Sequence, residues 1–159
     1  MKFLPGPKKD VLEASVVFQI SAREEALLLA TLRLYPLVEN SHHQISRNPE
    51  KAGSSEQRLL EESMAQHRAA HRRKLDELFR APQRFFKDAV DERRLVLTGE
   101  QLEWLLQVLN DIRVGSWVRL GCPDLEKAGP LQPTRQNVRA LQAMHVSGQF
   151  QSALLEAVQ

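Results

Sequence analysis

Residues 98–120 read TGEQLEWLLQVLNDIRVGSWVRL, and their pattern decides the fold. Placed on a helix at about 100° per residue, the apolar side chains cover a broad arc of roughly 220°, with a narrow polar strip opposite. A helix at a protein surface carries a narrower apolar stripe, so this pattern predicts a central helix with other elements packed around most of it. The arc comprises Leu102, Trp104, Leu105, Leu106, Val108, Leu109, Ile112, Gly115, Ser116, Trp117 and Leu120, and the strip holds Glu103, Gln107, Asn110 and Asp111.

A short strand and a helix cap precede this central helix. Residues 94–97, RLVL, are typical of a strand. Thr98 and Gln101 then form a capping box, in which each side chain bonds a backbone amide that has no partner within the helix. The central helix is therefore predicted to start at this cap and to run to about Leu120.

The same order of strand, cap and helix occurs near the start of the chain. Residues 12–20, LEASVVFQI, alternate as a half-buried strand does, and Ser21 with Glu24 forms a second capping box. A helical run follows, and Pro36 is expected to end or kink it. The two caps, Ser21 and Thr98, stand 77 positions apart. An internal duplication and the ordinary form of a strand-to-helix junction both explain this repetition, and in either case the two strands are predicted to pair.

The remaining segments add helices and loops. Residues 55–80 predict a long helix with a stripe at helical spacing, formed by Leu60, Met64, His67, His71, Leu75 and Leu78, with Phe79 beside it. Pro82 suits the first turn of a short helix that continues through Val90. Thr134 is expected to cap a last helix that runs through Ala157 and is interrupted near Ser147 and Gly148.

The predicted fold class is mainly α, a compact helical domain with a minor two-stranded sheet. Residues 1–159 are expected to form one domain, because a chain of this length can bury a sufficient core as a single unit. Within it, residues 1–10 are interpreted as an N-terminal tail, residues 39–54 as a mobile loop and residues 121–133 as a second loop, since prolines, glycines and short polar residues gather there.

The composition excludes several classes of protein. The chain contains a single cysteine, Cys122, which cannot form an intramolecular disulfide. This excludes a disulfide-stapled secreted scaffold and favours a reducing compartment. No stretch approaches the roughly 18 consecutive apolar residues of a membrane-spanning helix, and residues 1–10 lack the apolar region of a secretory signal. The sequence therefore predicts a cytoplasmic protein without a membrane partner.

The net charge of the chain is only +2, but basic residues are concentrated in residues 68–87. Acidic residues are interspersed among these basic ones, which is typical of a solvated helix, whereas a nucleic-acid surface concentrates positive charge on one face. Both interpretations stay open for this region. Its basic members are Arg68, Arg72, Arg73, Lys74, Arg80, Arg84 and Lys87.

Arg113 is the most informative charged residue, because it projects from the apolar side of the central helix. A buried guanidinium needs a carboxylate or carbonyl partner. One interpretation is structural: the stem carries the charge out to solvent, or the charge pairs with an acid on another helix. The other is functional, with Arg113 binding an anion or a second subunit. The acids considered as partners are Glu61, Glu62 and Asp88.

The histidines offer an incomplete metal site. His67 and His71 stand at positions i and i+4 of the long predicted helix, a spacing that lets two imidazoles reach one ion. The HExxH signature is absent, because Arg68 follows His67. A third ligand is not located by the sequence, although His145 or the His42–His43 pair could supply one. Half-buried structural histidines remain the ordinary interpretation.

The sequence assigns no catalytic, cofactor-binding or metal-binding residue. It contains no GxSxG elbow, no GxxxxGK-S/T phosphate loop, no GxGxxG stretch and no CxxC pair. Cys122 follows a helix end rather than preceding a helix start, which is not the setting of an activated thiolate. It is interpreted as an ordinary loop residue.

The central helix also resembles the signature of a family of unknown function, DUF2017. Members of that family carry a leucine-asparagine-aspartate-leucine-arginine run on an apolar helix, followed by an arginine-leucine-glycine ending. Asn110, Asp111, Arg113 and Arg119 match that pattern, as do Leu120 and Gly121, whereas Ile112, Val114, Trp117 and Cys122 depart from it. The resemblance implies an uncharacterised bacterial protein, chiefly actinobacterial, encoded near the adaptor subunit of the Clp protease and thus linked to protein turnover. It implies no enzymatic activity, and some members are labelled transcriptional regulators.

These observations favour a non-catalytic interaction or regulatory protein that associates with itself or with another protein. The alternative is a nucleic-acid-binding transcriptional regulator that uses the basic region of residues 68–87. A metal-dependent or hydrolytic enzyme is the third hypothesis. Asn110, Asp111, Arg113 and Arg119 are the residues predicted to mark the family or to take part in an interaction.

Overall fold

Helix α3, Gly99–Arg119, forms the centre of the fold, as its wide apolar arc predicts. The computed structural model describes residues 1–4, 15–38, 55–80, 85–87, 92–124, 129 and 131–156. Trp117 departs from the predicted arc: it is 38% exposed, and its Nε1 donates a hydrogen bond of 3.1 Å to the carbonyl of Pro123. The α3 residues that are buried are Leu102, Trp104, Leu105, Val108, Leu109, Ile112, Gly115 and Ser116.

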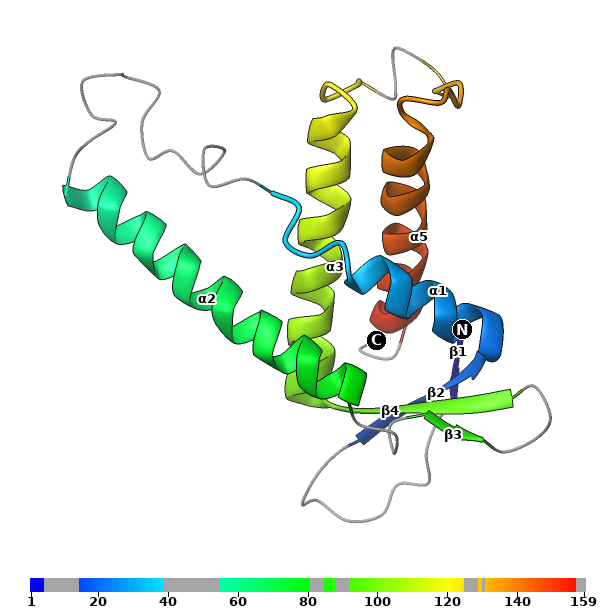
Figure 1. Cartoon of the computed structure of the whole chain (residues 1–159). Coiled ribbons are helices and arrows are strands. Elements are labelled where there is room, and N and C mark those ends of the chain that lie inside the picture. Colours follow the sequence, from blue (N-terminus) through cyan, green and yellow to red (C-terminus); the bar gives the residue numbers. More distant parts are fainter. Residues whose placement is uncertain are drawn as a thin grey trace.

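A minor antiparallel sheet lies at one end of the helices (Figure 1). Strands β2, Ser15–Ser21, and β4, Glu92–Thr98, are the two that the sequence predicts, and they pair with each other as expected. Two shorter strands, β1 at Lys2–Leu4 and β3 at Phe85–Lys87, extend this pair on either side in the order β1-β2-β4-β3. The chain is thus mainly helical with a minor sheet, whose central pair is the predicted one.

Two local predictions are wrong at the edges of the sheet. Residues 85–87 form β3 instead of part of a short helix, because their backbone pairs with residues 93–95 of β4. Residues 2–4 form β1 instead of a free tail, because they pair with residues 17–19 of β2. In both cases pairing with another strand of the sheet outweighs the local signal. The rest of the predicted tail, and residues 39–54, lie outside the described residues.

Both strand-cap-helix units have the predicted cap. The Ser21 hydroxyl accepts a hydrogen bond of 3.2 Å from the amide of Glu24, and the Thr98 hydroxyl accepts one of 3.2 Å from the amide of Gln101. Both boxes are completed by the return bond to the cap amide. In the sheet, Phe18 stands opposite Leu95, its counterpart 77 positions later. Because the strands are antiparallel, the neighbouring counterparts do not face each other: Ile20 stands opposite Arg93 and not Leu97.

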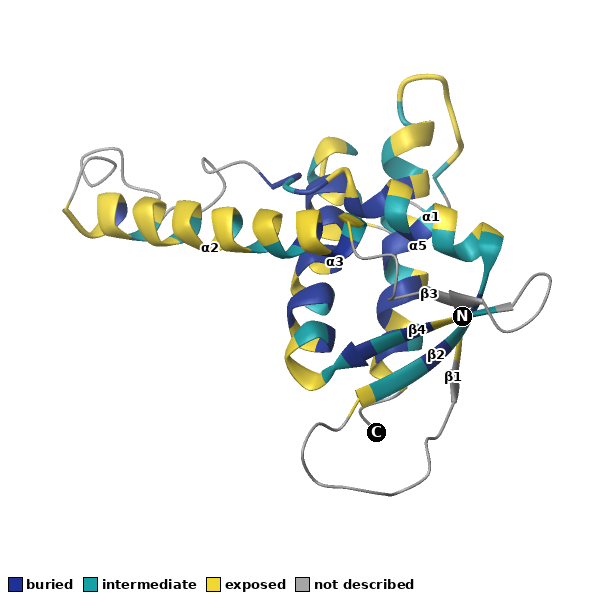
Figure 2. Cartoon of the chain, turned by 60° about the horizontal axis from the view of Figure 1, so that its bottom comes forward, coloured by how far each residue is buried: buried dark blue, intermediate teal, exposed yellow. Residues whose placement is uncertain are grey.

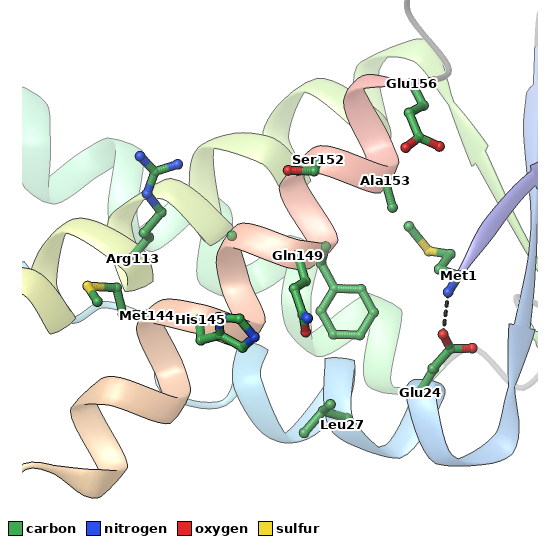
Figure 3. Close-up of a pocket in the computed structure, with 12 residues that line it drawn as sticks. Met1, Glu24, Leu27, Arg113, Met144, His145, Gln149, Ser152, Ala153 and Glu156 are labelled. Carbon is green, nitrogen blue, oxygen red and sulfur yellow. Dashed lines mark hydrogen bonds and ion pairs between the residues drawn. The ribbon is translucent and has the colours of Figure 1, made fainter. Parts of the chain in front are cut away.

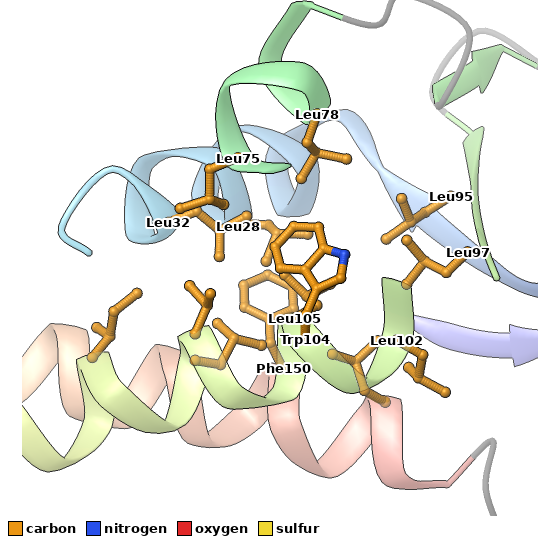
Figure 4. Packing of buried hydrophobic residues seen from close by; sticks show 14 of the residues in the cluster. Leu28, Leu32, Leu75, Leu78, Leu95, Leu97, Leu102, Trp104, Leu105 and Phe150 are labelled. Carbon is orange, nitrogen blue, oxygen red and sulfur yellow. The ribbon is translucent and has the colours of Figure 1, made fainter. Parts of the chain in front are cut away.

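Helices α1, Ala22–Leu32, and α5, Val138–Leu155, pack with α3 above the sheet (Figure 1). Leu28 of α1, Trp104 of α3 and Phe150 of α5 converge with leucines of β4 in one core (Figure 4). Large apolar side chains buried in this way supply most of the stability of a small domain.

Helix α5 starts later than predicted and is not interrupted. Thr134 and Asn137 bond each other across a turn, through Asn137 Oδ1 with the Thr134 amide at 2.7 Å and Thr134 Oγ1 with the Asn137 amide at 3.3 Å, and α5 begins after them. The helix continues through Ser147, whose buried hydroxyl donates a hydrogen bond of 2.7 Å to the carbonyl of Ala143 one turn earlier. This bond lets serine sit inside a helix without exposing an unpaired polar group.

Helix α2, Ser55–Arg80, projects away from the other elements (Figures 1 and 2). A helix of this length measures about 39 Å. Its C-terminal end packs into the core through Leu75 and Leu78, whereas the rest of the predicted stripe is at most partly buried. Leu59, beside that stripe, is 66% exposed. The sequence predicts this helix correctly but does not predict that most of it extends beyond the core.

Candidate functional site

The four residues that mark the family resemblance do not form one site. Asp111 has a structural position: its Oδ1 accepts hydrogen bonds from the amides of Leu37, at 2.7 Å, and Val38, at 3.3 Å. These amides belong to the segment that follows α1 and crosses α3. Asn110, next to Asp111, is exposed. Asp111 therefore holds a connecting segment against the central helix.

Arg113 is exposed, as in the interpretation in which its stem carries the charge out to solvent. Its stem lies near Gly148 of α5, and its Nη1 donates a hydrogen bond of 3.3 Å to Oε1 of Gln151. Gln151 is itself buried and donates through Nε2 to the carbonyl of Leu106, at 3.3 Å. The partner is thus an amide rather than an acid: Glu61 and Glu62 lie on α2, and Asp88 lies outside the described residues. The stem carries the charge across α5 to solvent, because this edge of α3 is only partly covered.

Arg113 borders a groove of about 730 Å³ that runs along α5 (Figure 3). Figure 3 shows Arg113 at one end and Glu24 with Met1 at the other, with His145, Gln149 and Ser152 of α5 between them. The Met1 ammonium forms an ion pair with Glu24, and the Ser21 amide donates to the same carboxylate at 2.9 Å. Burial acts to raise the pKa of Glu24, but these bonds outweigh it, so the pKa lies below its usual value.

The groove brings polar side chains together without an evident catalytic arrangement. Ser152 and His145 are seven residues apart on α5, which is about 10.5 Å along the helix axis and too far for a hydrogen bond. Glu24 is occupied by its bonds to Met1 and Ser21. Among the described lining residues, no nucleophile therefore contacts a base.

Arg119, the fourth marker, lies two turns beyond Arg113 and borders a separate cavity between the C-terminal end of α3 and the N-terminal end of α5. The family-marking residues thus divide into a structural aspartate, an exposed asparagine and two arginines at different cavities.

The basic region is split by the structure. Arg68 donates a hydrogen bond of 2.8 Å to the carbonyl of Val38, and Lys74 forms an ion pair of 2.8 Å with Glu100. Arg72, Arg73 and Arg80 are exposed on α2. The remaining predicted members, Arg84 and Lys87, have side chains outside the described residues. The described part of the region therefore presents a mixed surface rather than a continuous basic face.

His71 is bonded within the protein. Its Nδ1 lies 3.3 Å from the hydroxyl of Tyr35, and its ring centroid lies 6.5 Å from that of His67. Burial, followed by the charge of Lys74, lowers the pKa of His71 below 6.5. Burial and the charge of Asp111 raise the pKa of Tyr35 to about 12. Among the described residues, no group of three or more His, Cys, Asp or Glu side chains is placed to hold a metal ion.

The lowered pKa of His71 predicts a pH-dependent stability. Between the ordinary histidine value of about 6.5 and the lower folded value, the unfolded state binds more protons than the folded state. We therefore expect the free energy of unfolding to decrease as the pH falls through this window, which urea denaturation at a series of pH values measures. His71→Gln should flatten the dependence, and the matched change His145→Gln, on an exposed ring of α5, should leave it in place. An equal slope in wild type and His71→Gln would contradict this assignment.

Comparisons with known proteins supply no relative, since no family model, curated protein or solved structure matches this chain. Within the described residues, no helix is both long enough and apolar enough to cross a membrane. The sequence identifies Arg113 and Arg119 but does not predict the cavities beside them, because the walls of these cavities come from α1 and α5 as well as α3. It also missed the exposed face of α2.

Proposed function

We propose that this chain is a non-catalytic interaction protein that associates with a second copy of itself through one face of α2. This outward face is turned away from Leu75 and Leu78, the residues that anchor the helix in the core. All its residues are exposed, and Leu59 at 66% is the most exposed large apolar side chain among the described residues. The outward face consists of Leu59, Glu62, Gln66, Ala69, Ala70 and Arg73, and Glu77 and Arg80 continue it to the C-terminal end of α2.

The outward face suits helix-to-helix contact. Its members recur at intervals of three or four residues, so they line one side of α2. Ala69 and Ala70 provide small side chains near the middle of the helix, which allow a second helix to approach closely. An apolar leucine on a projecting helix gains by being buried in an interface. This exposed face is the single observation that carries the proposal.

The charges of α2 favour a second copy in antiparallel orientation. The outward face carries Glu62 and, about 16 Å further along the axis, Arg73. Glu61 and Arg72 stand next to them around the helix, and we call Glu61–Glu62 the acidic segment and Arg72–Arg73 the basic segment. In an antiparallel pair of α2 helices, each acidic segment faces the basic segment of the other copy. A parallel pair would place like charges together, which disfavours that arrangement.

Association should therefore depend on both segments. We expect sedimentation equilibrium to show a concentration-dependent dimer for the wild type, and a monomer for the double variant Arg72→Glu with Arg73→Glu. Leu59→Glu should also weaken association, by about tenfold or more, because it places a charge in the interface. The matched control Glu103→Arg with Glu156→Arg changes two exposed charges elsewhere and should leave the dimer intact. A wild type that stays monomeric at high concentration would overturn the proposal.

Less supports the nucleic-acid alternative, because Arg68 and Lys74 are already engaged within the protein. Binding of a DNA duplex that weakens steeply with salt and is lost in the Arg72 and Arg73 variant would favour it over self-association. The DUF2017 resemblance places such an interaction protein near protein turnover, and the exposed thiol of Cys122 suits a reducing cytoplasm. Both of these remain part of the proposal.

A further inference from the structure

A second cavity, of about 570 Å³, opens where the C-terminal end of α3 meets the N-terminal end of α5. Figure 1 shows these two ends side by side, on the side of the molecule away from the sheet. Arg119 of α3 and Arg139 of α5 both border the cavity, and both are exposed. Neither guanidinium forms an ion pair or hydrogen bond with a described residue.

The first turn of α5 adds amides without a hydrogen-bond acceptor beside these two arginines. The amide of Val138 donates to the carbonyl of Thr134 at 3.0 Å, and that of Leu141 donates to the carbonyl of Asn137 at 2.9 Å. The amides of Arg139 and Ala140, between them, have no acceptor among the described residues. Asn137 makes no side-chain cap bond to the helix. Unsatisfied amides and the helix dipole together favour an anion at this position.

The C-terminal end of α3 also borders this cavity, and three of its last four carbonyls, those of Ser116, Trp117 and Val118, accept hydrogen bonds within the chain. The amides of Leu120, Gly121 and Cys122 donate to carbonyls of the last turn at distances between 2.9 and 3.2 Å. Gly121, with a φ of 82°, permits the tight reversal that makes these bonds.

Ser116 gives an independent indication of a ligand. It lines the cavity and is 0% exposed, and its Oγ has no hydrogen-bond partner among the described residues. A buried hydroxyl without a partner is costly, and in native proteins such a group calls for a functional explanation. A serine in a helix can bond the carbonyl one turn back, as Ser147 does, but Ser116 makes no such bond. Ser116 therefore places a buried, unpaired hydroxyl in the wall of this cavity.

The other walls combine apolar side chains with the polar residues Gln136 and Asn137. Four leucines line the cavity: Leu34, Leu37, Leu120 and Leu131. A smaller cavity of about 220 Å³ shares Leu34, Arg139 and Ala143 with it and continues between α1 and α5 past Leu27 and Val146. A ligand held by the arginines can therefore extend an apolar chain along these side chains.

We propose that this cavity binds a ligand with an anionic head group, a carboxylate or a phosphate, on an apolar chain. The head group lies between Arg119, Arg139 and the free amides of α5, and Ser116 bonds the ligand from the inner wall. The chain lies against the leucines and continues into the smaller cavity.

Isothermal titration calorimetry of the full chain tests this site with decanoate, decyl phosphate, hexanoate and uncharged decanol. Each buried methylene contributes about threefold to fourfold in affinity. Decanoate or decyl phosphate should therefore bind at least about tenfold more tightly than hexanoate. Decanoate and decyl phosphate should each also bind more tightly than decanol. Whichever head group binds better identifies the natural one. No saturable binding of either anion, or equal binding of decanol, would overturn the proposal.

Variants locate the site. Arg119→Gln and Arg139→Gln should each weaken decanoate binding by about tenfold, as expected for loss of a charged hydrogen-bond donor. Arg113→Gln changes an arginine at the groove on the other side of α5. It is the matched control and should leave decanoate binding unchanged. Ser116→Ala should weaken binding while leaving the thermal midpoint of the free protein unchanged or raised, because it removes an unpaired buried hydroxyl. A lowered midpoint in Ser116→Ala, or a loss of binding in Arg113→Gln equal to that in Arg119→Gln, would contradict this placement.

Discussion

Gly115→Ala is expected to lower the free energy of unfolding by about 1–3 kcal/mol, the range typical of overpacking a well-filled core. A Cβ at this position of α3 would lie 2.6 Å from Leu37 Cβ, 2.7 Å from the Leu37 carbonyl carbon and 2.9 Å from the Val38 amide nitrogen. Two of these atoms belong to the backbone, so a side-chain rotation cannot relieve the contact. The segment after α1 would have to move away from α3.

The sign of this effect is the informative part, because glycine to alanine inside a helix normally stabilises by about 0.5–1 kcal/mol. Gly148 of α5 is the matched control: its added Cβ would meet only Arg113 Cδ, at 3.9 Å. Gly148→Ala should therefore raise the free energy of unfolding by about that amount. Urea denaturation of both variants gives the comparison, and a stabilising Gly115→Ala would contradict the close approach of the two segments.

Asp111→Ala should destabilise the protein by about 2–3 kcal/mol. Its carboxylate accepts from two backbone amides, of Leu37 at 2.7 Å and Val38 at 3.3 Å, and hydrogen bonds to a charged group contribute about 1.5–3 kcal/mol. Both Leu37 and Val38 are buried, so the amides have few other acceptors. Asp111→Asn, which keeps a carbonyl oxygen, should recover part of the loss.

The neighbouring residue provides the control for Asp111. Asn110 is exposed, and Asn110→Ala should change the free energy of unfolding by less than about 0.5 kcal/mol. Urea denaturation measures the free energy of unfolding of both variants. Equal decreases in the Asp111 and Asn110 variants would show that the hydrogen bonds of Asp111 to residues 37–38 do not stabilise this region.

Asp111 and Gly115 stand about one turn apart on α3 and have related structural roles. Both act on the same segment, one by bonding its amides and the other by leaving room for its backbone. The two arginines of the resemblance have a different position, each beside a cavity. Helix α3 thus carries two residues with structural roles and two exposed arginines. The residues of the resemblance therefore do not form one site.

The sequence predicts the elements of this fold well where the signal is local. The capping boxes at Ser21 and Thr98 set the helix starts correctly, and the apolar arc of residues 98–120 identifies the central helix. Pairing of the two predicted strands follows from their alternation and from the repeated cap. Each of these signals depends on residues within a few positions of one another.

The wrong or missing predictions concern contacts between one element and another. Strand β3 forms because β4 pairs with it, which the local pattern around Pro82 does not reveal. Arg113 lies on an apolar arc, yet α5 covers only part of that edge and offers Gln151 as a partner. The direction in which α2 leaves the core, and the cavities between α3 and its neighbours, likewise depend on packing rather than on periodicity.

A mixing experiment tests most directly the proposed pairing of α2 with α2 of a second copy through segments of opposite charge. One variant reverses the basic segment, Arg72→Glu with Arg73→Glu, and the other reverses the acidic segment, Glu61→Arg with Glu62→Arg. Each variant alone should be monomeric, because both segments then carry the same sign. Sedimentation equilibrium of an equimolar mixture should show a heterodimer, since every acidic segment again faces a basic one. A mixture that remains monomeric while the wild type dimerises, or variants that each dimerise alone, would contradict it.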